Sequence, residues 1–264
     1  MIEVHHLTKR YGTHLAVEDL SFTVEQGTVY GLLGPNGAGK STTMNILTGY
    51  ISASDGTVSI DGHDILEEAE AAKACVGYLP EQPPLYLDMT AKEYLEFAAR
   101  LKKVPRDQRA AQVERAMERT GVSPVSGRLI RNLSKGYRQR VGLAAALLGD
   151  PKVVILDEPI VGLDPAQVIE KRALITELGK DHTVILSSHI LSEVSALCDQ
   201  VLIINKGHLV ARAPRKSWPA GWKAAGWSTS PPWAKRTPWP PSCAVCPAWT
   251  RCAPGRKTAG WTPR

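Results

Sequence analysis

Residues 34–41 have the types and spacing needed to hold a polyphosphate. Gly34, Gly39, Lys40 and Ser41 complete the pattern G-x-x-x-x-G-K-S. In this pattern successive backbone N–H groups surround the phosphates, because glycines leave no Cβ to block their approach. The lysine reaches the β- and γ-phosphates, and the serine hydroxyl ligates Mg²⁺. The sequence therefore predicts a nucleoside triphosphate site here, rather than an ordinary glycine-rich turn.

Such a loop needs a strand before it and a helix after it. Val29–Leu33 is a short apolar run, and Lys40–Leu47 has apolar residues at helical spacing. The start of that helix adds unpaired N–H groups and the positive end of the helix dipole. The other loop positions expected to contact the nucleotide are Pro35, Asn36, Gly37, Ala38 and Thr42.

Further reactive side chains follow two other apolar runs. Asp157 and Glu158 come directly after Val153–Leu156, and His189 follows a run that begins at Thr183. Unbroken β-branched runs are typical of buried parallel strands, and nucleotides bind beyond the carboxyl ends of such strands. Asp157 is placed to hold Mg²⁺ through water, and Glu158 to polarise the attacking water, a contribution of about 10²–10⁴-fold. The alternative interpretation of Asp157 and Glu158 is an ordinary turn.

Composition limits the partners and the compartment. The chain has 32 basic and 26 acidic residues, but ten of the basic ones follow Val210, so the first 210 residues carry a net charge of −4. An acidic body gives no reason to expect nucleic acid as a partner. No apolar run approaches the ~18 residues that span a bilayer, and the first residues do not resemble a signal peptide. We therefore expect a cytosolic body.

The remaining segments predict the parts of the fold that support this site. Residues 1–33 alternate apolar and polar positions, which indicates a small antiparallel β lobe. Tyr11 is expected in its first loop, where a tyrosine either packs or stacks on a purine. Residues 81–150 contain three amphipathic helical patterns, the first with a capping box at Thr90 and Glu93. The expected fold is α/β, with a P-loop core, an N-terminal antiparallel β lobe and a helical insert.

The combination of motifs resembles one family. Residues 133–140 read LSKGYRQR and resemble the ABC signature, and they precede the strand that ends at Asp157. Gly162-Leu163-Asp164 resembles the D-loop, and His189 the switch histidine. Over about residues 1–210 the chain resembles the ATP-binding subunit of an ABC transporter, most of all the bacterial ABC-2 exporter and gliding-motility-type group. We expect the ATPase domain to span residues 1–211.

The resemblance implies a head-to-tail homodimer or heterodimer that binds two MgATP. Ser134 and Gly136 of one subunit would face the other subunit's phosphate loop, and the helix start at Ser134 suits a γ-phosphate. The resemblance also implies that Tyr11 stacks on adenine and that His189 senses the γ-phosphate, acting with Lys40 and Glu158 in catalysis. Glu81 stands where the family has its Q-loop glutamine, and Gln82 follows it. Either could approach Mg²⁺ and the attacking water.

An ABC ATPase subunit implies a separate integral-membrane permease, docked near residues 80–95. The chain would then be peripheral, at the cytoplasmic face of the inner membrane, and would hydrolyse ATP to drive transport of a substrate that the sequence does not identify. Two other hypotheses are a soluble ABC ATPase acting on ribosomes or DNA, and a nucleotide-binding scaffold without turnover.

Residues 212–264 differ from the rest of the chain. All seven tryptophans lie there, with no acidic residue, leucine or isoleucine. This composition predicts a disordered segment without a core. Three interpretations stay open: a reading-frame shift, a genuine basic segment for a membrane surface or partner, or a metal site at Cys243, Cys246 and Cys252.

Overall fold

A six-stranded sheet carries the phosphate loop in the computed structural model, which describes residues 1–214. The strand order is β10-β9-β3-β8-β7-β6, and all neighbours pair in parallel except β10 with β9. The strands are β3 Val29–Leu33, β6 Val76–Leu79, β7 Val153–Leu156, β8 Thr183–Ser188, β9 Gln200–Asn205 and β10 His208–Pro214. The predicted P-loop α/β core is confirmed.

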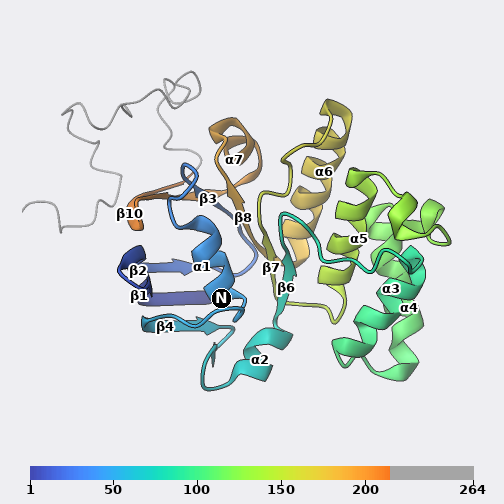
Figure 1. The fold of residues 1–264 in the computed structure, drawn as a ribbon, viewed down its shortest axis with the longest axis horizontal. Helices are drawn as coiled ribbons and strands as arrows, with labels where there is room; N and C mark the ends of the chain where they lie inside the picture. Colours follow the sequence, from blue (N-terminus) through green and yellow to red (C-terminus); the bar gives the residue numbers. More distant parts are fainter. Residues whose placement is uncertain (215–264) are drawn as a thin grey trace, which may run out of the picture.

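The antiparallel lobe lies beside this sheet and forms the blue end of the molecule (Figure 1). Its strand order is β2-β1-β4-β5, with bounds β1 Ile2–Tyr11, β2 His14–Val24, β4 Asp55–Ile60 and β5 His63–Asp64. The lobe is joined to the main sheet where Glu18 N donates to Gly207 O at 2.9 Å. The predicted lobe is confirmed, with one difference in detail, since Tyr11 ends β1 instead of standing in the loop.

Two apolar cores cover the two faces of the main sheet. Tyr30 and Leu32 of β3 belong to the core beneath the lobe and α1, Lys40–Leu47, while Val29 and Leu33 belong to the core on the other face. This alternation is the period-two pattern of a strand buried on both sides. The second face is covered by α6, Pro165–Asp181, and α7, Leu191–Leu197.

Three helices form a third core beside β6, at the end of the molecule opposite the lobe (Figure 1). They are α3 Ala91–Leu101, α4 Arg106–Thr120 and α5 Lys135–Leu147; the short α2, Ala69–Ala74, and two 3₁₀ turns, Ser123–Val125 and Ile130–Asn132, complete the described helices. The predicted capping box is present, since Thr90 Oγ1 accepts from Glu93 N and the Glu93 carboxylate accepts from Thr90 N. Such a box stabilises the start of α3 by satisfying two otherwise unpaired N–H groups.

The change in composition after Val210 falls inside a strand. Ala211–Pro214 pair with β9, and the Arg212 guanidinium donates to the Tyr30 hydroxyl at 2.9 Å. The predictions for the rest of the segment, including the cysteine site at Cys243, Cys246 and Cys252, lie outside the described residues.

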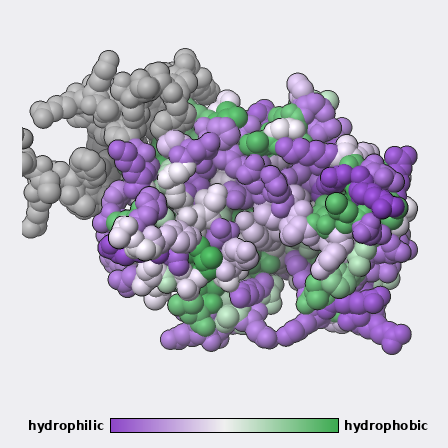
Figure 2. Space-filling model, in the orientation of Figure 1, coloured by the Kyte–Doolittle hydropathy of each residue, from purple (hydrophilic) through white to green (hydrophobic). Residues whose placement is uncertain are grey.

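The face visible in Figure 2 is mainly hydrophilic, and its apolar residues form separate small patches. Within residues 1–214, none of the helices combines the length and the apolar character required to cross a bilayer.

Lys171 interrupts the buried stripe of α6. It shares this stripe with Ile175 and Leu178, its exposed fraction is 5%, and its Nζ has no hydrogen-bond partner within the described part of the chain. Burial, and then the nearby Arg140 guanidinium, lower the pKa of Lys171 to about 8. Because both causes disfavour the charged form, this lysine weakens the folded state at neutral pH.

We expect Lys171→Met to raise the free energy of unfolding by about 3 kcal/mol at pH 7. Below pH 8 the lysine is charged in both folded and unfolded states, so the whole difference is present. Between about 8 and the ordinary value of 10.5 the folded lysine loses its proton first, so the advantage of the variant shrinks.

Chemical denaturation at several pH values measures both effects, and Lys180→Met, at an exposed position of the same helix, is the matched control. A variant no more stable than the parent at pH 7 would contradict the assignment of a charged, unpartnered lysine.

Candidate functional site

A pocket of about 530 Å³ lies where β3, β7 and β8 end. It is lined by ten residues that the sequence predicted for the site, namely Tyr11, Asn36, Gly37, Gly39, Lys40, Ser41, Thr42, Glu81, Glu158 and His189. His14, Ala16 and Val161 complete the lining. The structure thus brings together residues that are far apart in the sequence, from Tyr11 at the end of β1 to His189 directly after β8.

The phosphate loop takes a backbone path that requires glycine. Gly37 and Gly39 have φ of 77° and 104°, and a Cβ on Gly39 would lie 2.7 Å from the carbonyl oxygen of Ala16. Lys40 is 5% exposed, and its Nζ donates to Gly34 O at 2.9 Å and to Pro35 O at 3.3 Å. The ammonium group is therefore held over its own loop, beside the N–H groups at the start of α1.

Glu158 connects the loop to His189. Its Oε1 lies 3.5 Å from Lys40 Nζ, and its Oε2 lies 3.1 Å from His189 Nδ1. The Glu158 side chain is 11% exposed and its φ is +47°, in the left-handed region that residues other than glycine rarely adopt. Such backbone strain is concentrated at functional sites, where the surrounding structure holds it in place.

Sequence reasoning missed Ser187. Its Oγ donates to Asp157 Oδ1 at 2.6 Å and accepts from Glu158 N at 2.8 Å, so one hydroxyl orients both acidic residues. The signal that could have found it is the strand register, because β7 pairs with β8 through Leu156 and Leu186, which puts Ser187 beside Asp157. That register depends on the tertiary structure, so it cannot be predicted from the residue types alone.

Several predicted site residues do not line the pocket. Gly34, Pro35 and Ala38 lie within the loop itself, and Asp157 is buried, with 7% exposure, behind the Ser187 hydroxyl. Gln82 is exposed and outside the lining, whereas Glu81 is part of it. The Glu81 carbonyl accepts from Gln139 Nε2 at 2.5 Å, which joins this segment to α5.

Ser134 and Gly136 lie at the start of α5, away from the pocket lining. Ser134 is exposed, and its Oγ caps the helix by accepting from Tyr137 N at 3.3 Å. A Cβ on Gly136 would collide with the Gln167 side chain of α6, so this glycine permits close contact between the two helices. Within one chain the structure does not bring these two residues to the phosphate loop.

The donor atoms at the predicted metal position suit Mg²⁺. Ser41 offers a hydroxyl and Asp157 a carboxylate, and hard oxygen ligands are those that Mg²⁺ binds, usually together with water and substrate phosphates. Among the described residues no group of three or more His, Cys, Asp or Glu side chains comes together as a metal site.

The comparisons with known proteins agree with this geometry. The family model for the ABC transporter matches residues 17–161. The bacitracin transport ATP-binding protein BcrA of Bacillus licheniformis is 38% identical over 216 residues, which cover 81% of this chain and 70% of the relative. The ABC transporter A family member 1 of Dictyostelium discoideum is 36% identical over 192 residues, and there the chain spans only 22% of the relative.

A solved structure of a related chain has the same fold. The structure of cbiO1 from Clostridium perfringens, described as part of the ABC transporter complex cbiONQ, matches with a TM-score of 0.74 and 29% identity, over 81% of this chain and 88% of that chain. With a complete phosphate loop, an Asp157–Glu158 pair and a matching cassette fold, the chain belongs to the ABC transporter family, as one of its ATP-binding ATPase subunits.

Proposed function

We propose that this chain hydrolyses MgATP at an interface between two ATPase subunits and so drives transport by a separate membrane permease. The proposal rests on the separation, within one chain, of the phosphate-binding residues from the start of α5. The pocket holds the phosphate loop, Glu158 and His189, while Ser134 lies at the exposed start of α5, outside the lining. A second subunit, of the same or a related chain, supplies the missing helix start.

Each side chain has a role that follows from its position. When ATP binds, the Lys40 ammonium group gives up its hydrogen bonds to the carbonyl oxygens of Gly34 and Pro35 and donates to the β- and γ-phosphates instead. Glu158 then accepts a proton from the attacking water, and His189, which already contacts Glu158, responds to the γ-phosphate. Mg²⁺, when bound by Ser41 and Asp157, stabilises charge on the phosphate oxygens.

The start of α5 suits the partner subunit's nucleotide. Ser134 caps this helix, and the unpaired N–H groups and dipole of a helix start attract anions. Because Gly136 packs directly on α6, the start of α5 is held in place by the helix that follows the D-loop. This support is the physical basis for assigning Ser134 and Gly136 to the trans half of the ATP site.

Tyr11 is assigned to the adenine. Tyr11 is 48% exposed, so it is not a core residue, and it lines the nucleotide pocket. Lys9 Nζ stands 5.3 Å from the ring centroid and fixes one face by a cation–π contact. The ring can therefore stack on a purine, as aromatic side chains do in nucleotide sites.

An aromatic cluster that follows Glu81 and is exposed at Tyr86 is assigned to the permease. Tyr86 contacts Tyr94 and Phe97, at centroid distances of 6.2 and 5.4 Å, and both Tyr86 and Leu87 are more than 45% exposed. Exposed apolar groups of this kind are typical of binding surfaces. Through this contact the chain would be peripheral, at the cytoplasmic face of the inner membrane, as in ABC-2 exporters.

We expect Glu158→Gln to lower kcat for ATP hydrolysis by about 10²-fold or more while keeping ATP binding, because the amide cannot accept the proton of water. With hydrolysis blocked, ATP should hold two subunits together, which gel filtration with MgATP detects. Glu114→Gln, an exposed position on α4, is the matched control. Undiminished phosphate release by the Glu158 variant would refute its role as the base.

Ser187→Ala tests the hydroxyl that orients both acidic residues. Loss of one buried hydrogen bond to a carboxylate leaves Asp157 and the Glu158 backbone free to shift, so kcat should fall about tenfold. Nucleotide affinity in the absence of Mg²⁺ should change little. Ser192→Ala, at an exposed position, should match the parent in both measurements, and equal kcat in the two serine variants would contradict the orienting role.

Tyr11→Ala should weaken ATP binding about tenfold, since a base–aromatic stack contributes about 1–3 kcal/mol. Tyr11→Trp should keep the parental affinity, because any aromatic face serves. Fluorescent-nucleotide titration measures both variants. A tryptophan variant as weak as the alanine variant would show that the hydroxyl or a packing role, rather than stacking, is what matters.

A further inference from the structure

The turn that carries His189 is held by side chains that have no part in the mechanism described above. His189 lies between Ser188, the last residue of β8, and Ile190, which directly precedes α7. It lines the nucleotide pocket, and its side chain is 40% exposed. A side chain with this much exposure has few packing contacts to fix its rotamer, so its position depends on the backbone that carries it. The residues on either side of His189 therefore help to decide where its imidazole lies.

Ser188 fixes this turn at both of its ends. Its carbonyl oxygen accepts from Gly34 N at 3.4 Å, which joins the end of β8 to the first residue of the phosphate loop. Its hydroxyl accepts from Ile190 N at 3.0 Å, across His189, and donates to Glu193 Oε2 at 2.7 Å. Because a serine hydroxyl has one proton to donate, the bond to Glu193 orients the hydroxyl and leaves a lone pair for Ile190 N.

Glu193 presents its carboxylate from a rigid position. It is the third residue of α7 and is 9% exposed. The next residue, Val194, packs so closely on β3 that a Cβ on Gly31 would collide with its side chain. Such close packing leaves α7 little freedom to move relative to the main sheet. The carboxylate is therefore an acceptor held at a fixed distance from the end of β8.

Stabilisation of α7 alone does not account for this arrangement. An acidic side chain in the first turn of a helix interacts favourably with the helix dipole, and it does so equally well when it faces water. The Glu193 carboxylate is buried instead, which is costly unless it is hydrogen-bonded. Its bond to Ser188 reaches back five residues along the chain, to the other side of His189.

We propose that Glu193 is a positioning residue for ATP hydrolysis, which acts through the Ser188 hydroxyl to hold His189 against Glu158. In this arrangement His189 Nδ1 lies 3.1 Å from Glu158 Oε2, within the nucleotide pocket. Without the carboxylate the Ser188 hydroxyl turns away, its bond from Ile190 N weakens and the turn loosens. The effect on turnover rests on the proposed function, in which His189 responds to the γ-phosphate, whereas the hold on the turn does not.

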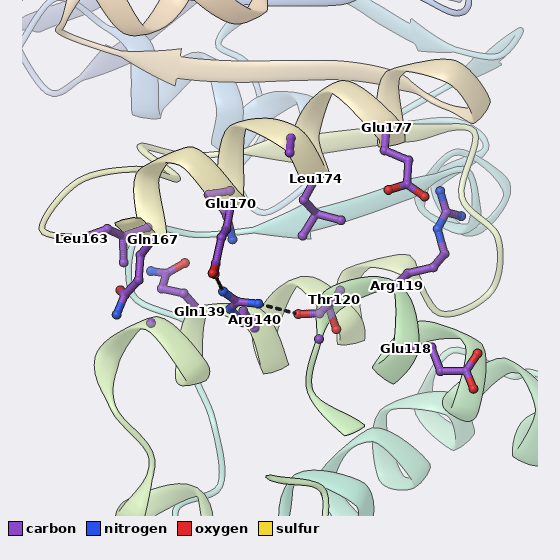
Figure 3. A pocket seen from close by; sticks show the side chains of 14 residues that line it. Glu118, Arg119, Thr120, Gln139, Arg140, Leu163, Gln167, Glu170, Leu174 and Glu177 are labelled. Carbon is purple, nitrogen blue, oxygen red and sulfur yellow. Dashed lines mark hydrogen bonds and ion pairs between the residues drawn. The ribbon is translucent and has the colours of Figure 1, made fainter. Parts of the chain in front are cut away.

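Two variants separate the hydrogen bond from the packing. Glu193→Met removes the oxygen acceptor and opens no large cavity, because methionine is of similar size and adapts its shape. Glu193→Gln keeps a carbonyl oxygen that can accept from the Ser188 hydroxyl. Glu177→Met is the matched control. Glu177 is an exposed glutamate of α6, and the pocket that it lines shares no residue with the nucleotide pocket (Figure 3).

We expect Glu193→Met to lower kcat for ATP hydrolysis about tenfold, the effect of losing one hydrogen bond that orients the site. KM for ATP should stay within about twofold of the parental value, because Tyr11 and the phosphate loop are unchanged. Glu193→Gln should keep at least about half of the parental kcat, since its acceptor remains. Glu177→Met should match the parent. Steady-state phosphate release at several ATP concentrations gives both constants.

Hydrogen exchange of the Ile190 amide, followed by NMR without nucleotide, tests the hold on the turn directly. Glu193→Met should raise the exchange rate of this amide about tenfold or more, because the turn opens locally. The amides of α3 should keep their parental rates in the same variant. In Glu193→Gln the Ile190 amide should exchange as it does in the parent.

Four results would overturn the proposal. They are a parental kcat in Glu193→Met, an equal loss of kcat in Glu193→Met and Glu193→Gln, an unchanged exchange rate at Ile190, and a rise of the same size at the α3 amides. The last would show a general loss of stability instead of a loosened turn. A parent chain without phosphate release would refute the proposed function, and the exchange rates would still decide whether Glu193 holds the turn.

Discussion

The parallel pairing of β3, β8 and β7 is the constraint on which the site depends. Leu33 pairs with Ser188 and Leu156 with Leu186, so the three strands end at the same edge and deliver the phosphate loop, the two acidic residues and His189 together. A slip of one residue would turn every side chain of a strand to the opposite face. The cores on both faces oppose such a slip, because all five residues of β3 are buried.

Two buried lysines differ in whether their ammonium groups have hydrogen-bond acceptors among the described residues. Burial lowers the pKa of Lys102 to about 8, as it does for Lys171. Lys102, however, donates to the carbonyls of Ala146 and Leu148 at 2.7 and 3.0 Å, where it closes the C-terminal end of α5 and meets the negative end of its dipole. Lys102 thus has hydrogen-bond acceptors that account for its burial, whereas Lys171 Nζ has none among residues 1–214.

Local patterns predicted much of the fold. The phosphate loop, the strand before Asp157 and the capping box at Thr90 are each specified by residues close in sequence, and each occurs as expected. The Ser187 hydroxyl, the choice of Glu81 over Gln82 in the pocket lining and the burial of Lys171 depend on contacts between distant segments. Propensity and periodicity carry no information about such contacts, and the roles of the site residues remain predictions.

The bond from Gln139 to the carbonyl of Glu81 has a mechanical consequence. Residues 81–87 touch the nucleotide pocket at one end and present exposed Tyr86 and Leu87 at the other, and this bond ties the segment to α5. A displacement at Tyr86 would therefore be transmitted in two ways, along the backbone to Glu81 and through the hydrogen bond of the Gln139 amide to α5.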